Sequence, residues 1–243
     1  MKYVAADSGA PSKKLDRILV LDIGGTHIKV LGPGRSERLE IESGLTMTPT
    51  RMVAAVKKLT AGKQYDRISI GYPGPVVHGR PLAEPANLGA GWVGFDFHKA
   101  FQHPLKMVND AAMQALGSYA GGRMLFLGLG TGLGSAMIVD GLVEPMELAH
   151  LPYRHGRTYE DYLGLRGLKR LGKKKWRKHV LEVASRLKSA VQADYVVLGG
   201  GNAKLLKEPP AGLRLGDNRT AFLGGRRLWL PPKLRSGSRL RIT

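Results

Sequence analysis

The chain contains no cysteine, and no run of apolar residues approaches the roughly 20 that a membrane-spanning helix needs. Without cysteine, disulfides and thiolate zinc sites are excluded, and a reducing cytoplasm is the simplest expected environment. Residues 1–16 lack the apolar stretch of a signal peptide, and we expect them to form a flexible lead. The sequence therefore predicts a cytoplasmic protein without a membrane partner.

Acidic residues are also scarce, because 19 Asp and Glu face 38 Lys and Arg, which gives a net charge of +19. Such a charge attracts nucleic acid, an anionic membrane or a phosphate polymer. The basic residues concentrate in the ranges 166–188 and 226–243. A solvated helix face and a disordered tail would explain both. The first range, however, continues into apolar positions with a helical period, so we place Lys173, Lys174 and Lys175 on an ordered helix.

Glycine is abundant, and two copies of one pattern place it after an apolar strand. Residues 17–23 run into Gly24, Gly25 and Thr26, and residues 123–129 run into Gly130, Thr131 and Gly132. Glycine lets a backbone approach a ligand closely, and such turns can direct several N–H groups at one anion. Two such turns, one in each half, predict a duplicated α/β protein that holds a phosphate chain, with phosphoryl transfer as the leading function.

The remaining periodicities alternate between strands and helices, which predicts mostly parallel sheets covered on both faces. In the first half we expect strands at 17–23, 28–31, 38–41, 67–71 and 105–108, and helices at 50–61 and 95–101. In the second half we expect a helix from Asn109, strands at 124–129, 135–139 and 195–198, a loop at 141–158 and a basic helix at 174–192.

Polar residues at the first glycine turn are candidates for phosphate chemistry. Asp22 would repel a phosphate directly, so its natural partner is Mg²⁺ or a bridging water, although a turn-capping role is also open. Thr26 and Lys29 can donate to phosphate oxygens. The spacing of a P-loop is absent.

Asn109 and Asp110 follow an apolar strand and open a helix, for which Asn109 is a suitable N-cap. A carboxylate at the carboxyl end of such a strand faces the ligand crevice, where it can accept the proton of an attacking alcohol. Alternatively, Asp110 only complements the helix dipole. The two interpretations stay open on these residues alone.

Further on, Glu147, His150 and Glu160 can bind several sugar hydroxyls, or a metal. Zinc is disfavoured, because there is no cysteine and only His155 is near His150. The ranges 71–75 and 87–92 are glycine-rich loops with a polar tip, for which turn chemistry alone is a sufficient explanation.

In their order and number these motifs resemble those of the ROK sugar kinases, which belong to the actin-like, sugar kinase and Hsp70 superfamily, and within them the polyphosphate glucokinases. The resemblance covers about residues 16–229 and is carried by segments 21–29, 71–74, 87–92, 109–111, 128–134, 147–150, 158–162 and 198–204. The sequence departs from the family in three ways. It lacks the zinc-binding cysteine cluster, it has Ala149 in place of a glycine, and its net charge is higher.

The resemblance implies a duplicated actin-like (ribonuclease H-like) α/β fold with two lobes around a cleft. Its parts would be a small lobe at 17–109, a larger lobe at 110–229 and a basic tail at 230–243. It implies Asp110 as the general base on the sugar 6-hydroxyl. The other sugar contacts would be Gly74, Asn87, Asn109, Glu147, His150 and Glu160. The phosphate contacts would be Asp22, Gly24, Gly25, Thr26, Lys29, Thr131 and Gly132. Nucleotide or polyphosphate would meet Gly199, Gly200, Gly201 and Lys173–Lys175.

We therefore expect a glucokinase that phosphorylates glucose at O6 with Mg²⁺, indirectly held by Asp22. Inorganic polyphosphate is the expected donor, and ATP is the alternative. The family also predicts a homodimer. A sugar-responsive regulator is a weaker alternative, because the 16 residues before Arg17 are too few for a DNA-binding helix-turn-helix, and we expect no specific nucleic-acid partner. A sugar-binding pseudokinase is disfavoured while Asp22 and Asp110 are present.

Overall fold

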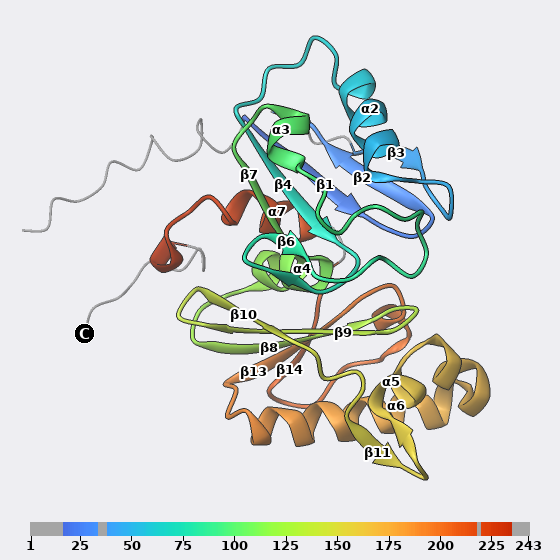
Figure 1. Ribbon diagram of the computed structural model, residues 1–243. Coiled ribbons are helices and arrows are strands. Elements are labelled where there is room, and N and C mark those ends of the chain that lie inside the picture. The colour runs from blue at the N-terminus through green and yellow to red at the C-terminus, as the bar shows by residue number, and fades with distance from the viewer. Residues whose placement is uncertain (1–16, 34–37, 218–219, 235–243) are drawn as a thin grey trace, which may run out of the picture. The chain divides into compact units, whose positions relative to one another are not determined.

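The computed structural model describes residues 17–33, 38–217 and 220–234 (Figure 1). The chain divides into two compact units between Val108 and Asn109. The lead expected at 1–16 and the tail beyond residue 234 lie outside the described residues. Each unit is built around a five-stranded sheet.

The first unit contains a mixed sheet with strand order β3-β2-β1-β4-β7. Its strands are β1 (Ile18–Ile23), β2 (His27–Leu31), β3 (Arg38–Glu42), β4 (Arg67–Tyr72) and β7 (Leu105–Asn109). Strand β1 pairs antiparallel with β2 and parallel with β4. A separate short hairpin is formed by β5 (Val76–Val77) and β6 (Arg80–Pro81).

Two helices of the first unit contribute to the same core as β1. Helix α2 (Pro49–Leu59) begins after Thr48, whose side chain accepts the Arg51 N–H at 3.3 Å, and Pro49 occupies the first helical position. The helix buries Met52, Val53 and Val56. Helix α3 (Phe97–Phe101) buries both of its phenylalanines in that core.

The second unit repeats this arrangement, with strand order β10-β9-β8-β13-β14. Its strands are β8 (Arg123–Leu129), β9 (Leu133–Val139), β10 (Leu142–Met146), β13 (Tyr195–Gly199) and β14 (Leu213–Leu215). Again the first three strands form an antiparallel meander. Strand β8, at the edge of this meander and in the centre of the sheet, pairs parallel with β13. The predicted duplicated α/β fold is thereby confirmed.

Helices lie on both faces of the second sheet (Figure 1). Helix α4 (Asp110–Ser118) covers one face and packs against α7 (Thr220–Arg227), and α5 (Tyr159–Leu163) and α6 (Leu165–Ala190) cover the other face. The shorter elements are β11 (Pro152–Arg154), β12 (Arg157–Thr158), η1 (Ala203–Leu205) and η2 (Pro232–Leu234). Among the described helices, none combines the length and the apolar character that crossing a membrane would require.

Helices α4 and α7 approach each other closely at two glycines. A Cβ on Gly117 would overlap the Thr220 carbonyl, and one on Gly224 would overlap the Met113 carbonyl. Arg227 completes this contact, because its Nη1 donates at 2.9–3.0 Å to carbonyls at the carboxyl end of α4. The end of α4 opposite Asp110 is thus fixed by α7.

Three predictions about the elements were wrong. The sheets are mixed rather than mostly parallel, because short turns join their first three strands as antiparallel meanders. The loop expected at 141–158 contains β10, β11 and β12. Helix α6 begins at Leu165 rather than residue 174, and it is interrupted at Gly172, whose φ of 72° and ψ of 159° are not helical.

Candidate active site

The first glycine turn lies between β1 and β2. Within it the Gly24 N–H donates to the His27 carbonyl at 3.0 Å, and the Gly24 carbonyl accepts the Ser43 hydroxyl at 2.7 Å. The Gly24 amide is therefore used inside the turn. The amides of Gly25 and Thr26 donate to no acceptor within the described residues, so two N–H groups remain for an anion.

Asp22 lies in β1, directly opposite Lys29 of β2. Its side chain is 7% exposed, and Oδ2 lies 3.4 Å from Lys29 Nζ. Burial raises the pKa of Asp22, and the charge and hydrogen bond of Lys29 oppose that shift. Within the described residues Lys29 is its hydrogen-bonding partner, and no turn N–H is capped by it. A buried carboxylate with one long ion pair fits an oxygen ligand for a cation better than a structural cap.

Asn87 lies beside this turn, although the two are distant in sequence. A Cβ on Gly25 would lie 2.7 Å from the Asn87 Cβ, so only glycine permits the approach. The loop of Asn87 is also held by the Gly89 N–H, which donates to the Met47 carbonyl at 3.1 Å. Gly74 has a different neighbour, because a Cβ there would lie 2.9 Å from the Tyr72 ring. The Asn87 loop thus lies against the first glycine turn, whereas the contact of Gly74 is with Tyr72 of β4.

In the second unit, α4 begins with the two candidates Asn109 and Asp110. Asn109 is the N-cap, as predicted, since its Oδ1 accepts the N–H of Ala111 at 2.9 Å and of Ala112 at 3.4 Å. The Asp110 side chain is half-buried in the first turn. Gly134 of β9 packs against this turn, because a Cβ there would lie 2.7 Å from the Ala111 Cβ. The second glycine motif therefore adjoins the Asp110 turn.

Glu160 contacts the second glycine turn, which lies between β8 and β9. Its Oε2 accepts the Leu133 N–H at 3.1 Å, and a Cβ on Gly132 would overlap that oxygen. Within the turn, the Gly130 N–H donates to the Gly132 carbonyl at 3.1 Å, while the amides of Thr131 and Gly132 have no acceptor among the described residues. The second turn thus repeats the arrangement at Gly24, with a carboxylate added.

Glu147 and His150 follow β10 and are exposed. The Glu147 carboxylate accepts the Ala149 N–H at 3.2 Å, and the Ala149 carbonyl accepts the Glu160 N–H at 3.0 Å. These two bonds link Glu147 and Glu160 through Ala149, and His150 is the next residue in the chain. Among the described residues there is no group of three or more His, Cys, Asp or Glu that could hold a metal ion.

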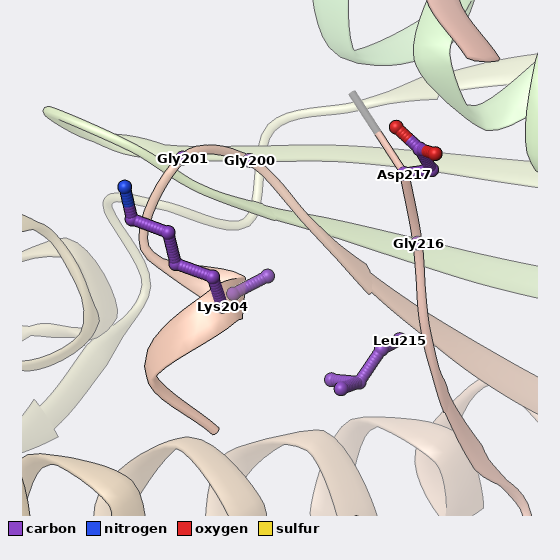
Figure 2. A pocket seen from close by; sticks show the side chains of 7 residues that line it. Gly200, Gly201, Lys204, Leu215, Gly216 and Asp217 are labelled. Atoms are coloured by element: carbon purple, nitrogen blue, oxygen red, sulfur yellow. The ribbon is translucent and has the colours of Figure 1, made fainter. Parts of the chain in front are cut away.

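The segment that contains Gly199, Gly200 and Gly201 lies against the second glycine turn. A Cβ on Gly200 would lie 2.5 Å from the Leu129 carbonyl, and Asn202 Nδ2 donates to the Gly130 carbonyl at 3.0 Å. Beside it is a pocket of about 390 Å³, lined by Gly200, Gly201, Ala203, Lys204, Leu215, Gly216 and Asp217. Figure 2 shows the turn of Gly200 and Gly201 opposite the segment of Leu215, Gly216 and Asp217. The volume is in the range of small-ligand sites.

Lys173, Lys174 and Lys175 follow the interruption of α6 at Gly172 and are exposed. Within the described part of the chain their side chains form no hydrogen bond or ion pair. Arg177 connects the same helix to the pocket, because its Nε donates to the Leu205 carbonyl at 2.6 Å, at the end of η1. The lysines are thus on the helix that supports one wall of the pocket, without touching another candidate residue.

Sequence reasoning missed several residues that organise these turns. Asn202 lies in the segment 198–204 that carries part of the family resemblance, but the sequence did not predict its hydrogen bond to the Gly130 carbonyl. Ser43 lies just after β3, and only the folded sheet brings its hydroxyl to Gly24. Glu84 and Asp217 lie in loops without periodicity, so no pattern singled them out.

No family model matches the chain. A curated polyphosphate glucokinase from Mycobacterium tuberculosis (strain ATCC 25177 / H37Ra) is 27% identical over 207 residues, covering 74% of this chain and 76% of the relative. The chain is similar to the polyphosphate glucokinases. The resemblance inferred from the motifs is thereby confirmed.

Solved structures show the same fold. The inorganic polyphosphate/ATP-glucomannokinase from Arthrobacter sp. strain KM matches with a TM-score of 0.71 and 23% identity, covering 86% of this chain and 96% of that one. A ROK family protein from Streptococcus pneumoniae TIGR4, in complex with sucrose, matches with a TM-score of 0.70 and 16% identity, covering 87% and 98%. The fold is that of the ROK sugar kinases.

Proposed function

We propose that the protein is a glucokinase that transfers a phosphoryl group to O6 of glucose, with inorganic polyphosphate as the donor. One observation supports this most: the second glycine turn carries two unengaged amides and contacts the Glu160 carboxylate, and the strand that leaves this turn packs through Gly134 against the first turn of α4, which carries Asp110. A carboxylate base, hydroxyl acceptors and anion-binding amides are the groups that phosphoryl transfer to a sugar requires. The similarity to polyphosphate glucokinases supports the substrate pair.

In this proposal Asp110 accepts the proton of the 6-hydroxyl as its oxygen attacks the terminal phosphoryl group. Asn109 fixes the turn on which Asp110 sits, through its two bonds to backbone amides. Glu147, His150 and Glu160 bind and orient the sugar hydroxyls, and Asn87 is a further candidate for a sugar contact. A sugar held by several fixed groups presents one hydroxyl to the donor, which lowers the entropic part of the barrier.

The charge of the phosphoryl group is stabilised by backbone amides in both glycine turns. The unengaged N–H groups are those of Gly25, Thr26, Thr131 and Gly132, and such preorganised donors act most strongly where charge develops. Asp22 would hold Mg²⁺ through water, which fits its burial and its single long ion pair. The ion, when bound, supplies charge neutralisation to the phosphate oxygens.

The exposed lysines of α6 favour polyphosphate as the phosphoryl donor. A polyphosphate chain carries about one charge per unit, so it gains from a series of cations that extends beyond one subsite. Lys173, Lys174 and Lys175 are exposed, unpaired among the described residues and on the helix that supports the pocket through Arg177. We assign them to the chain of the donor rather than to its reacting end.

Neutralising these lysines tests that assignment. The variant K173Q/K174Q/K175Q is expected to raise the KM for long polyphosphate and to leave the KM for ATP nearly unchanged. The slope of log KM against log salt concentration should fall by about 2, because each lost contact to a single-stranded polyanion removes about 0.7. The control K57Q/K58Q/K99Q removes the same charge from exposed lysines of the first unit. The assignment of these lysines to polyphosphate would be wrong if both triple variants raised the KM for polyphosphate equally. It would also be wrong if K173Q/K174Q/K175Q changed the KM for polyphosphate and for ATP equally.

ATP is the second candidate donor, and the pocket beside Gly200 favours it. Its volume of about 390 Å³ and its glycine-lined wall suit a flat base placed against backbone. The resemblance also places adenine beside Gly199–Gly201. Formation of glucose 6-phosphate by the purified protein with Mg²⁺ separates the donors. Turnover with polyphosphate supports the proposal, turnover with ATP alone replaces the donor, and no turnover with either contradicts the kinase.

A further inference from the structure

Glu84 holds the two ends of the Asn87 loop together. It lies between β6 and Asn87, and its two carboxylate oxygens accept backbone N–H groups from beyond the loop. Oε2 accepts the Trp92 N–H at 3.1 Å, and Oε1 accepts the Val93 N–H at 3.0 Å. The N–H groups of Val93 and Trp92 lower the pKa of Glu84, and burial opposes this shift. The carboxylate is therefore ionised at neutral pH, as charge-assisted bonds require.

The neighbouring residues fix the same loop base from the other side. The Tyr72 hydroxyl donates to the Ala83 carbonyl at 2.9 Å, and burial, together with the charge of Glu84, raises the pKa of Tyr72, so it stays a donor. Trp92 is fully buried beside Tyr72 and Phe97, with ring centroids 5.7 Å and 6.2 Å away. The base of the loop is thus anchored, while its tip is not part of a helix or strand.

Trp92 also carries a cost that these contacts must offset. Its buried Nε1–H has no hydrogen-bond partner among the described residues, and an unsatisfied buried donor opposes burial. The indole is consequently held by aromatic packing and by the Glu84 bond to its backbone, not by its own N–H. A change at Glu84 acts on this position directly.

The tip of the loop is Asn87, which lies against Gly25 of the first glycine turn. We infer that Glu84 is a positioning residue that sets where Asn87 stands beside that turn, and thereby sets the affinity of the site for its hexose. The inference deepens the proposed function and rests on it for the identity of the ligand. Both carboxylate oxygens of Glu84 accept backbone N–H groups, so we assign Glu84 to the loop and not to a substrate contact.

The variant Glu84→Gln tests this with two measurements. A glutamine has one acceptor oxygen in place of two, and its NH₂ group opposes the second backbone N–H. In hydrogen–deuterium exchange, the amides of Trp92 and Val93 should exchange faster than in the wild type. In calorimetric titration without a donor, glucose should bind about tenfold more weakly, and in turnover the KM for glucose should rise while the KM for the donor and kcat stay close to wild type.

Glu144→Gln is the matched control, because Glu144 is exposed on β10 and its loss changes the net charge equally. Unchanged protection of Trp92 and Val93 in Glu84→Gln would overturn the inference, as would lost protection with unchanged glucose affinity. A wild type that binds no hexose would instead contradict the proposed function and, with it, the role of Glu84 in hexose affinity. The exchange measurement would still decide whether the carboxylate anchors the loop, so the two failures are distinguishable.

Discussion

Gly132→Ala should separate hexose binding from the rest of the site. The Cβ that this change adds overlaps Glu160 Oε2, the atom that accepts the Leu133 N–H at 3.1 Å. Because the backbone of the β8–β9 turn cannot move as easily as a side chain, the carboxylate must leave. A hydrogen bond to a charged group contributes about 1.5–3 kcal/mol, so the Glu160 carboxylate loses about that much of the free energy that holds it in its present orientation. If Glu160 binds the sugar, glucose affinity should fall about 10- to 100-fold.

The assay is calorimetric titration of glucose in the absence of a phosphoryl donor, so that contacts of the turn with phosphate do not contribute. Gly130→Ala is the control within the same turn, because a Cβ at Gly130 meets nothing within 4 Å and its φ is not positive. This control should bind glucose as the wild type does. Equal affinities for the two variants would refute the placement of Glu160 in the hexose site.

Two further predictions concern the stability of the second unit. Arg227→Met removes the hydrogen bonds of the guanidinium to the carboxyl end of α4 and should lower the free energy of unfolding, measured by urea denaturation, by about 2–3 kcal/mol. Arg227→Lys should recover part of this stability. Wild-type stability in both variants would contradict the role of Arg227 at the end of α4. Burial, followed by the charge of Arg154, lowers the pKa of His179 below its usual 6.5, while Glu182 opposes the shift. Native His179 is therefore neutral beside the Tyr153 hydroxyl at 2.9 Å, and stability should decline as the pH falls below about 6.5 because the unfolded chain binds the proton more readily. The decline in Tm should be smaller in His179→Gln, and an identical pH profile would oppose the assignment.

The features that the sequence predicted correctly have strong local causes. Both glycine turns were located because each ends a largely apolar strand, and Asn109 was placed at a helix start because its side chain suits an N-cap. The duplication followed from the repeated pattern of strand and turn. These signals need no knowledge of tertiary contacts, and the strand orders of the two sheets confirm them.

The missed features depend on contacts between distant segments. Gly164 precedes α6, and Gly167 and Gly172 lie in its first part, where they weaken a helical pattern. Gly167 is nevertheless required, because a Cβ there would overlap the Tyr162 carbonyl. Strands β11 and β12 are too short for a period-2 pattern. Glu84 is an exposed acid whose partners are backbone amides, and backbone amides have no signature in a sequence.

Asp110→Asn tests the central claim most directly. The change keeps the size of the side chain and removes its capacity to accept the 6-hydroxyl proton. The rate of glucose 6-phosphate formation should fall about 10²- to 10⁴-fold with the preferred donor, while calorimetry should show glucose still bound by the variant. A variant that forms glucose 6-phosphate at the wild-type rate would contradict Asp110 as the base and, with it, this account of the site.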